Sequence, residues 1–290
     1  MFQTIKQDFI RFAITNWRFF ICSLVYLIWA ISLFGGNFAG VLLALILYAI
    51  SLLFVFSPLG ELLMRLLENV RKVETKREKE YLLPLFEEVY MEAQKINSRL
   101  GRIELGVIDT MAVNACAIGK HTIAVTKGAM ETFNSEELKA IMAHEIAHIV
   151  YGDTIVALYT VVGNGLFTVC VVLLRWFLTL LEMLEAMISK NNLLRLFIVL
   201  ARFIFDLIIF STMLLMNIML AVNSRKNEYR ADKYACMLGY GESLVEAFYL
   251  LEKIQLGNNS TIIQKILKRH PRITKRIERL ETLLDKENAA

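Results

Sequence analysis

Two histidines and a glutamate stand at a spacing that suits metal-dependent hydrolysis. His144 and His148 are four residues apart, and Glu145 directly follows the first of them. Residues four apart on an α-helix share one face, so both imidazoles can reach a single ion. Neutral imidazole suits zinc, and two histidines leave room for a third ligand and for water. The spacing therefore predicts one zinc ion per chain, held in part by His144 and His148.

Glu145 is placed to act as a general base. Zinc lowers the pKa of water beside it, and an adjacent carboxylate can accept the proton. The alternative is a helix with two surface histidines and a solvated glutamate. That alternative is disfavoured because buried polar groups in apolar surroundings would need partners. The neighbouring residues that make these surroundings uncharged are Ile141, Met142, Ala143, Ile146, Ala147, Ile149 and Val150.

An acidic pair downstream can complete the metal site. Glu228 and Asp232 are also four residues apart. We predict that Glu228 binds the metal and that Asp232 accepts the second N–H of a ligand histidine. Without the upstream histidines, a solvated charged helix face would be the default interpretation of this pair.

The composition indicates a membrane protein with a soluble part. Of the 290 residues, 56% are hydrophobic, and the mean hydropathy of +0.50 is well above that of a soluble globular chain. The net charge of +4 is modest, and the basic residues form no stripe interleaved with aromatics, which argues against nucleic-acid binding. The four cysteines lie far apart without C-x-x-C spacing, so nothing indicates a disulfide framework or a thiolate zinc site, and a reducing compartment is favoured.

Four apolar stretches predict membrane helices, because roughly 18 or more apolar residues can cross a hydrocarbon core of about 30 Å. The first two, about Phe19–Phe34 and Phe38–Phe56, are separated only by Gly-Gly-Asn and predict a hairpin. The third is Thr154–Leu174, and the fourth has a clean run over Leu207–Val222. A signal peptide is the alternative for the first stretch, but it lacks a small-residue cleavage site and a second apolar stretch follows almost at once.

Charges near these stretches predict their orientation. Arg202 and Asp206, upstream of the fourth clean run, either pair inside the membrane or lie near its boundary. We favour the boundary. Basic residues gather before the first stretch, after the second and after the fourth. By the positive-inside rule, both termini and the large polar segments face the cytoplasm of a cell (plasma or inner) membrane.

The polar segments carry their own signals of secondary structure. An amphipathic helical pattern extends to about Leu100, and Asn134 with Glu137 predicts the start of the helix that carries His144 and His148. The chain after Asn223 is helical in pattern, with breaks at 239–241 and near residues 270–271. Short β-type runs lie between the first two helical regions, over Ile103–Ile108, Ala115–Ile118 and Thr122–Thr126.

These features predict a mainly α-helical membrane protein with a cytoplasmic metalloprotease domain and a small β-sheet. Residues 1–56 form an N-terminal transmembrane hairpin, and 57–153 form a cytoplasmic protease part with the sheet and the motif helix. Residues 154–222 form a second transmembrane hairpin. Residues 223–290 form a cytoplasmic helical part with the third zinc ligand.

The chain resembles the HtpX-type membrane metalloproteases, within the superfamily that includes the CAAX prenyl proteases. The resemblance covers nearly the whole length and includes the stretch S-R-x-x-E-x-x-A-D, present here as Ser224–Asp232. It implies a zincin-like domain in which Glu228 is the third zinc ligand and Asp232 supports a ligand histidine. It also implies that unfolded or membrane polypeptides are the substrates.

The same resemblance implies further site residues. His270, followed by proline, matches a histidine that stabilises the oxyanion, although it could simply mark a helix start. Asn114 and Ala115 match a segment near a strand that pairs with substrate, although Asn114 could be an ordinary turn residue. The family usually has an aromatic residue where this chain has Cys116. Arg225 is matched too, with a role in orienting the site or the substrate.

The favoured function is therefore an integral-membrane zinc endopeptidase that cuts misfolded or damaged membrane proteins in cytoplasmic segments. A dedicated maturation protease for a lipidated or signalling peptide is one alternative. It is disfavoured because CAAX proteases have a larger membrane domain than the four spans predicted here. A non-catalytic zinc-containing scaffold is another, but it would have no use for Glu145. A transporter is disfavoured because charged residues within the stretches are few and peripheral.

Overall fold

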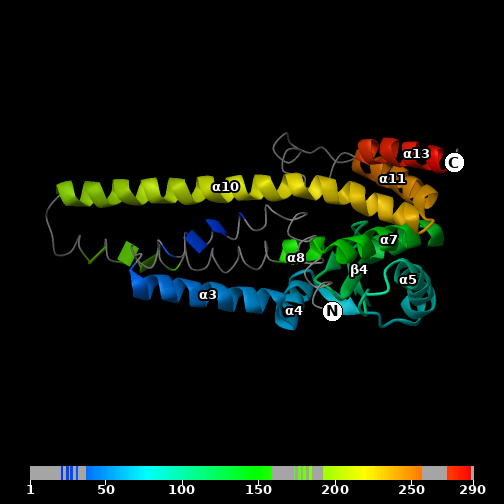
Figure 1. Cartoon of the computed structure of the whole chain (residues 1–290), viewed down its shortest axis with the longest axis horizontal. Coiled ribbons are helices and arrows are strands. Elements are labelled where there is room, and N and C mark those ends of the chain that lie inside the picture. Colours follow the sequence, from blue (N-terminus) through cyan, green and yellow to red (C-terminus); the bar gives the residue numbers. More distant parts are fainter. Residues whose placement is uncertain are drawn as a thin grey trace.

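The protein is mainly helical, with one small mixed sheet at one end (Figure 1). The structure, a computed structural model, describes residues 37–158, 192–256 and 273–288, and single positions between 21 and 31 and between 173 and 184. In Figure 1 the long helices α3 and α10 extend away from the end that holds the sheet, α5, α7, α11 and α13. The predicted helical class and the small sheet are confirmed.

The sheet has strand order β1-β2-β4-β3, with β2 and β4 parallel and the two outer pairs antiparallel. Three strands agree within one residue with the predicted runs: β2 (Glu104–Ile108), β3 (Ala115–Ile118) and β4 (Thr122–Thr126). Strand β1 (Val70–Lys72) was not predicted, because three residues of which two are charged give no strand pattern. The order leaves β3 as an edge strand, with β4 as its partner within the sheet.

The helix that carries the two histidines, α7, runs over Ser135–Tyr151. Its start is the predicted capping box, in which Asn134 and Glu137 each accept a hydrogen bond from the other's backbone N–H. It ends at Gly152, whose φ of 75° is left-handed and favours glycine. The elements that precede and follow it are α5 (Lys76–Ile96), α6 (Lys127–Thr132) and α8 (Asp153–Leu158).

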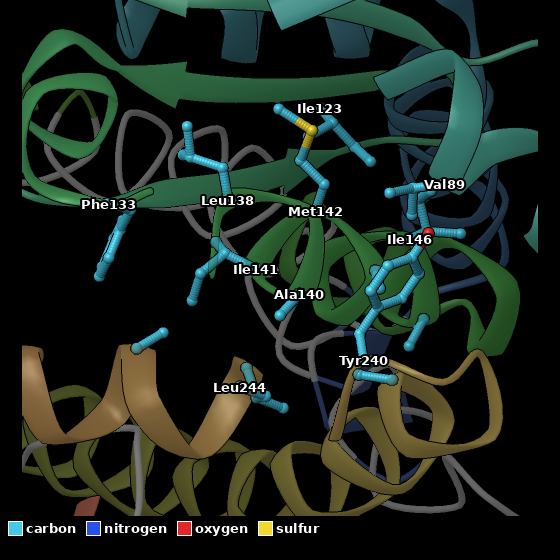
Figure 2. Packing of buried hydrophobic residues seen from close by; sticks show 14 of the residues in the cluster. Val89, Ile123, Phe133, Leu138, Ala140, Ile141, Met142, Ile146, Tyr240 and Leu244 are labelled. Carbon is cyan, nitrogen blue, oxygen red and sulfur yellow. The ribbon is translucent and has the colours of Figure 1, made fainter. Parts of the chain in front are cut away.

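Helix α7 is buried on several sides. Leu138, Met142 and Ile146 are fully buried, and Figure 2 shows the α7 side chains between Ile123 of β4 and Leu244 of α11. Burying each such side chain contributes about 1.5–3 kcal/mol. The packing therefore fixes the rotation of α7 and with it the direction of both imidazoles.

Helix α10 (Asn192–Met237) continues without interruption for 46 residues. The fourth apolar stretch and Glu228 therefore lie on one helix. The predicted boundary between residues 154–222 and residues 223–290 falls inside this helix. The predicted break at 239–241 is confirmed by a turn before α11 (Gly241–Leu256), with Gly239 at φ 87°. The other predicted break, near residues 270–271, lies outside the described residues, which resume with α13 (Ile273–Asn288).

The N-terminal apolar region consists of α3 (Phe38–Phe56) and α4 (Pro58–Leu67), joined at Ser57. Within the described ranges, no individual helix satisfies the length and hydropathy expected of a membrane span, whereas α3 and α4 satisfy them as a pair bent by 67°. The predicted stretches at 19–34 and 154–174 lie largely outside the described residues.

Candidate metal centre

Helices α7 and α10 bring the three predicted metal ligands together. The Nε2 atoms of His144 and His148 are 3.2 Å apart. Both face the carboxylate of Glu228. His144 Nε2 lies 3.4 Å from Glu228 Oε2, and His148 Nε2 lies 3.8 Å from Glu228 Oε1. One ligand atom from each residue lies within 4.8 Å of the other two. His144 and Glu228 are buried, so the group is enclosed by protein rather than spread over a surface.

The chemistry of this group fits zinc. Two imidazole nitrogens and one carboxylate oxygen form a set that is typical of catalytic zinc. The Nδ1 atoms of His144 and His148 each lie 3.0 Å from a carboxylate oxygen, of Asp232 and Asp153 respectively. A carboxylate at Nδ1 fixes the tautomer with the proton there, which leaves Nε2 as the metal ligand.

Asp232 lies where the sequence predicts it, beside a ligand histidine, one helical turn beyond Glu228. Burial alone would raise the pKa of the Asp232 carboxyl. The neighbouring Arg276 and His144 outweigh burial, so the pKa of Asp232 is lowered. Burial disfavours a charged His144, but Asp232 and Glu228 outweigh it, so the pKa of His144 is raised.

Asp153 lies beside His148 as Asp232 lies beside His144, although no role was predicted for Asp153 from the sequence. Its Oδ2 lies 3.0 Å from His148 Nδ1, and its Oδ1 accepts a hydrogen bond from Arg230 Nη2 at 2.7 Å. The Arg230 guanidinium stacks on the ring of Tyr151, 4.2 Å from its centroid. The carboxylate is thus held in place from two sides. The left-handed Gly152 before it turns the chain back toward α7, and this turn was the signal available in the sequence.

Asp153→Asn is expected to weaken zinc binding by about 10–100-fold, because the amide removes the negative charge that orients His148. Competition with a chromophoric chelator measures this affinity. Asp285→Asn, an exposed position on α13, is the matched control and should bind zinc as the wild type does. Equal affinity in the two variants would mean that Asp153 does not support the site.

Arg276, on α13, is the second functional residue that the sequence interpretation left without a role. Its Nη1 lies 2.9 Å from Glu228 Oε2, and its Nε donates to Asp232 Oδ2 at 2.9 Å. The guanidinium also stacks on Phe248, 4.2 Å from the ring centroid. Burial opposes its charge, but Asp232 and Glu228 outweigh this and raise the pKa of Arg276. The C-terminal helix therefore delivers a buried cation that neutralises two carboxylates of the metal centre.

Arg276→Met is expected to destabilise the folded protein by about 3–5 kcal/mol, because Glu228 and Asp232 would lose their buried cationic partner. Thermal unfolding of the metal-free protein in detergent measures the loss. Arg276→Lys, which keeps the charge but not the planar fork, should recover part of it. Arg279→Met, an exposed arginine on the same helix, is the control. An Arg276→Met protein as stable as Arg279→Met would contradict the role assigned to the buried ion pair.

The other predicted residues differ in what the structure says of them. Glu145 is half-buried on α7, and its charge adds to burial in raising the pKa of the Cys116 thiol to about 12. Asn114 and Ala115 lie at the start of edge strand β3, where Asn114 N donates to Thr126 Oγ1 at 3.0 Å. Two predictions fall elsewhere: the side chain of Arg225, on α10, and the whole of His270 lie outside the described residues.

Comparisons with known proteins agree with this geometry. Over 97% of this chain and 95% of the relative, the sequence is 27% identical to the Protease HtpX homolog of Dictyoglomus turgidum. It is 26% identical to the Protease HtpX homolog of Methylacidiphilum infernorum, over 69% of this chain and 72% of that protein. The predicted resemblance to HtpX proteases is confirmed.

A solved structure has a similar fold. The crystal structure of S. mikatae Ste24p matches with a TM-score of 0.51 and 17% identity, over 96% of this chain and 65% of that chain. This chain thus spans about two thirds of the length of Ste24p. Residues 76–284, which include α7, Glu228 and Arg276, match the model of peptidase family M48. By this match, which covers well over half of its length, the chain belongs to peptidase family M48 and is a zinc metallopeptidase.

Proposed function

We propose that this protein is an integral-membrane endopeptidase that degrades misfolded or damaged membrane proteins in their cytoplasmic segments. The observation that carries the proposal is the continuity of α10, which joins a largely apolar half to the half that carries Glu228. Along the apolar half, large side chains are exposed, including Phe197 at 70%, Phe203 at 65% and Phe210 at 65%. An apolar surface of this extent is typical of contact with a membrane or another protein.

We assign the metal chemistry to five residues of the chain. His144, His148 and Glu228 would hold one zinc ion, which when bound would polarise the scissile carbonyl and lower the pKa of the attacking water. Glu145 accepts a proton from that water and passes it to the leaving amine. Asp232 orients His144 through its Nδ1 atom.

The remaining assignments rest on the resemblance to HtpX proteases. His270 would donate to the oxyanion that forms on the scissile carbonyl. Asn114 and Ala115, on the edge strand, would pair with the extended backbone of the substrate. Arg225 would help to orient the site or the substrate.

The arrangement in the membrane follows from the distribution of charge. We place residues 1–56 and 154–222 in two transmembrane hairpins, with 57–153 and 223–290 on the cytoplasmic side. The basic clusters that flank the apolar stretches support this orientation in a cell membrane. The metal centre would then lie close to the cytoplasmic surface, within reach of unfolded segments that emerge from the bilayer.

Proteoliposomes can test this function with a pair of substrates. One substrate is a single-span membrane protein with a stable cytoplasmic domain, and the other has the same domain unfolded by a large-to-small core substitution. The zinc-loaded protein should cut the unfolded version faster, at many positions, and the Glu145→Gln variant should cut neither. Cleavage of both substrates at one defined sequence with equal rates would instead indicate a maturation protease.

A further inference from the structure

Helix α4 presents leucines away from the protein. Leu59, Leu62 and Leu66, here called the leucine face, share one side of the helix and are 58%, 50% and 65% exposed. The opposite side carries Gly60 and Met64, which are buried against the rest of the protein. A helix on a water-facing surface normally has the reverse distribution, with polar residues outward.

The polar side chain on the protein-facing side holds α4 in this orientation. The Glu61 side chain is 12% exposed, and its carboxylate accepts hydrogen bonds from Lys120 N at 3.1 Å and Thr122 Oγ1 at 2.7 Å. His121 Nδ1 lies 3.2 Å from the same carboxylate. At Gly119, φ 58°, a Cβ atom would collide with Glu61. Glu61 thus binds α4 to the β3–β4 turn. Rotation of α4 about its axis to bury the leucine face would break these hydrogen bonds.

Apolar packing joins α4 to the strand beside the metal centre. Met64 is buried in a small cluster with Ile118 of β3 and with Val156 and Leu158 of α8. Strand β3 is the sheet edge next to α7, the helix that carries His144. The leucine face therefore has a fixed position relative to the metal centre.

The direction of α4 suits a membrane surface. Helix α3, which also exposes large apolar side chains such as Ile50 (56%) and Leu53 (73%), meets α4 at an angle of 67°. If α3 stands along the bilayer normal, α4 lies within 90 − 67 = 23° of the bilayer plane. An amphipathic helix in that plane buries its apolar face in the boundary between headgroups and acyl chains while its other face remains with protein or water.

We propose that the leucine face of α4 lies in the lipid–water interface and holds the β3 edge at a fixed height above the bilayer. This inference rests on the proposed membrane function and adds how substrate reaches the site. A segment that leaves the bilayer in extended form would then meet a β3 edge that α4 holds close to the lipid, through the contacts of Glu61 with the β3–β4 turn and of Met64 with Ile118. Helix α4 directly follows α3, which also exposes large apolar side chains, and this favours lipid over a second copy of the chain as the partner of the leucine face.

Depth-dependent fluorescence quenching tests the proposal in the full-length protein. An environment-sensitive dye is attached to a cysteine at position 62 (Leu62→Cys) or 66 (Leu66→Cys) after the four native cysteines are replaced by alanine. Ile50→Cys on α3 and Lys79→Cys on the exposed side of α5 are the references. The liposomes of phosphatidylethanolamine and phosphatidylglycerol carry spin labels on the headgroup, at a shallow acyl carbon or at a deep one.

The expected profile differs at each position. Dyes at 62 and 66 should be quenched most by the shallow acyl label, which corresponds to about 5–10 Å into the boundary. The dye at 50 should be quenched by the deep label, and the dye at 79 by none. Deep quenching at 62 and 66 would overturn the proposal by making α4 part of the span. Absence of quenching there, with deep quenching at 50, would overturn it by leaving the leucine face in water or against another copy.

The reference at position 50 separates this inference from the proposed function. If the dyes at 62 and 66 give the shallow profile while the dye at 50 is not quenched, the interfacial helix stands and the membrane-spanning arrangement fails. The double variants Leu62→Glu/Leu66→Glu and Leu62→Lys/Leu66→Lys add a second readout. Lysine reaches headgroup phosphates and should preserve cleavage of a membrane-anchored substrate, whereas glutamate should reduce it several-fold. Both should cut soluble casein at the wild-type rate, and equal loss on casein would contradict the proposal.

Discussion

Glu145→Gln is expected to lower the rate of peptide-bond hydrolysis by about 10²–10⁴-fold while zinc content stays at the wild-type level. The amide keeps the size of the side chain but cannot accept the proton of the attacking water. His144, His148 and Glu228 are untouched by the change, so the metal ligands remain. Cleavage of unfolded casein after zinc is added to metal-free protein measures the rate, and zinc content is measured on the same sample.

The matched control is Glu136→Gln, on the same helix but 56% exposed and paired with Lys139. It should cut casein as the wild type does. If Glu145→Gln were as active as this control, the carboxylate would not be the general base. A scaffold with structural zinc would then become the better explanation of the site, because such a site needs no base.

Glu228→Ala is expected to reduce zinc affinity by more than the roughly 10–100-fold that the loss of an outer hydrogen-bond partner costs. The substitution removes one of three ligands and leaves only His144 and His148 to hold the ion. It also removes one of the two carboxylates that face Arg276, so a positive charge remains close to the metal position. Zinc content after dialysis, together with chelator competition, measures the effect.

Glu246→Ala, at an exposed position on α11, serves as the control and should retain its zinc. A Glu228→Ala protein that lost cleavage but kept its full zinc content and affinity would show that the third ligand lies elsewhere. Comparison with Asp153→Asn gives the order of effects. The loss should be larger for Glu228, which supplies a ligand atom, than for Asp153, which acts through His148.

The local signals in the sequence were sufficient for α7 and for most of the sheet. Asn134 and Glu137 predict the start of α7 because the capping box is a contact between residues three apart. The spacing of His144 and His148 predicts a shared face because helical periodicity is fixed by the backbone. In each case the physical cause lies within a few residues of the feature.

The parts that were not predicted depend on contacts between distant segments. Arg276 is one of many arginines until α13 packs on α10 and α11 and places its guanidinium between Glu228 and Asp232. Asp153 has a role only because Gly152 turns it back toward His148. Strand β1 forms because β2 offers a hydrogen-bonding edge, not because its own residues favour a strand.

A zinc titration of the metal-free wild-type protein in detergent tests the central claim most directly. Cleavage of casein should be absent without zinc, should rise in proportion to added zinc and should reach its plateau at one ion per chain. Full cleavage by the chelator-treated protein would contradict the account. A plateau that is reached only at two or more zinc ions per chain would contradict it as well.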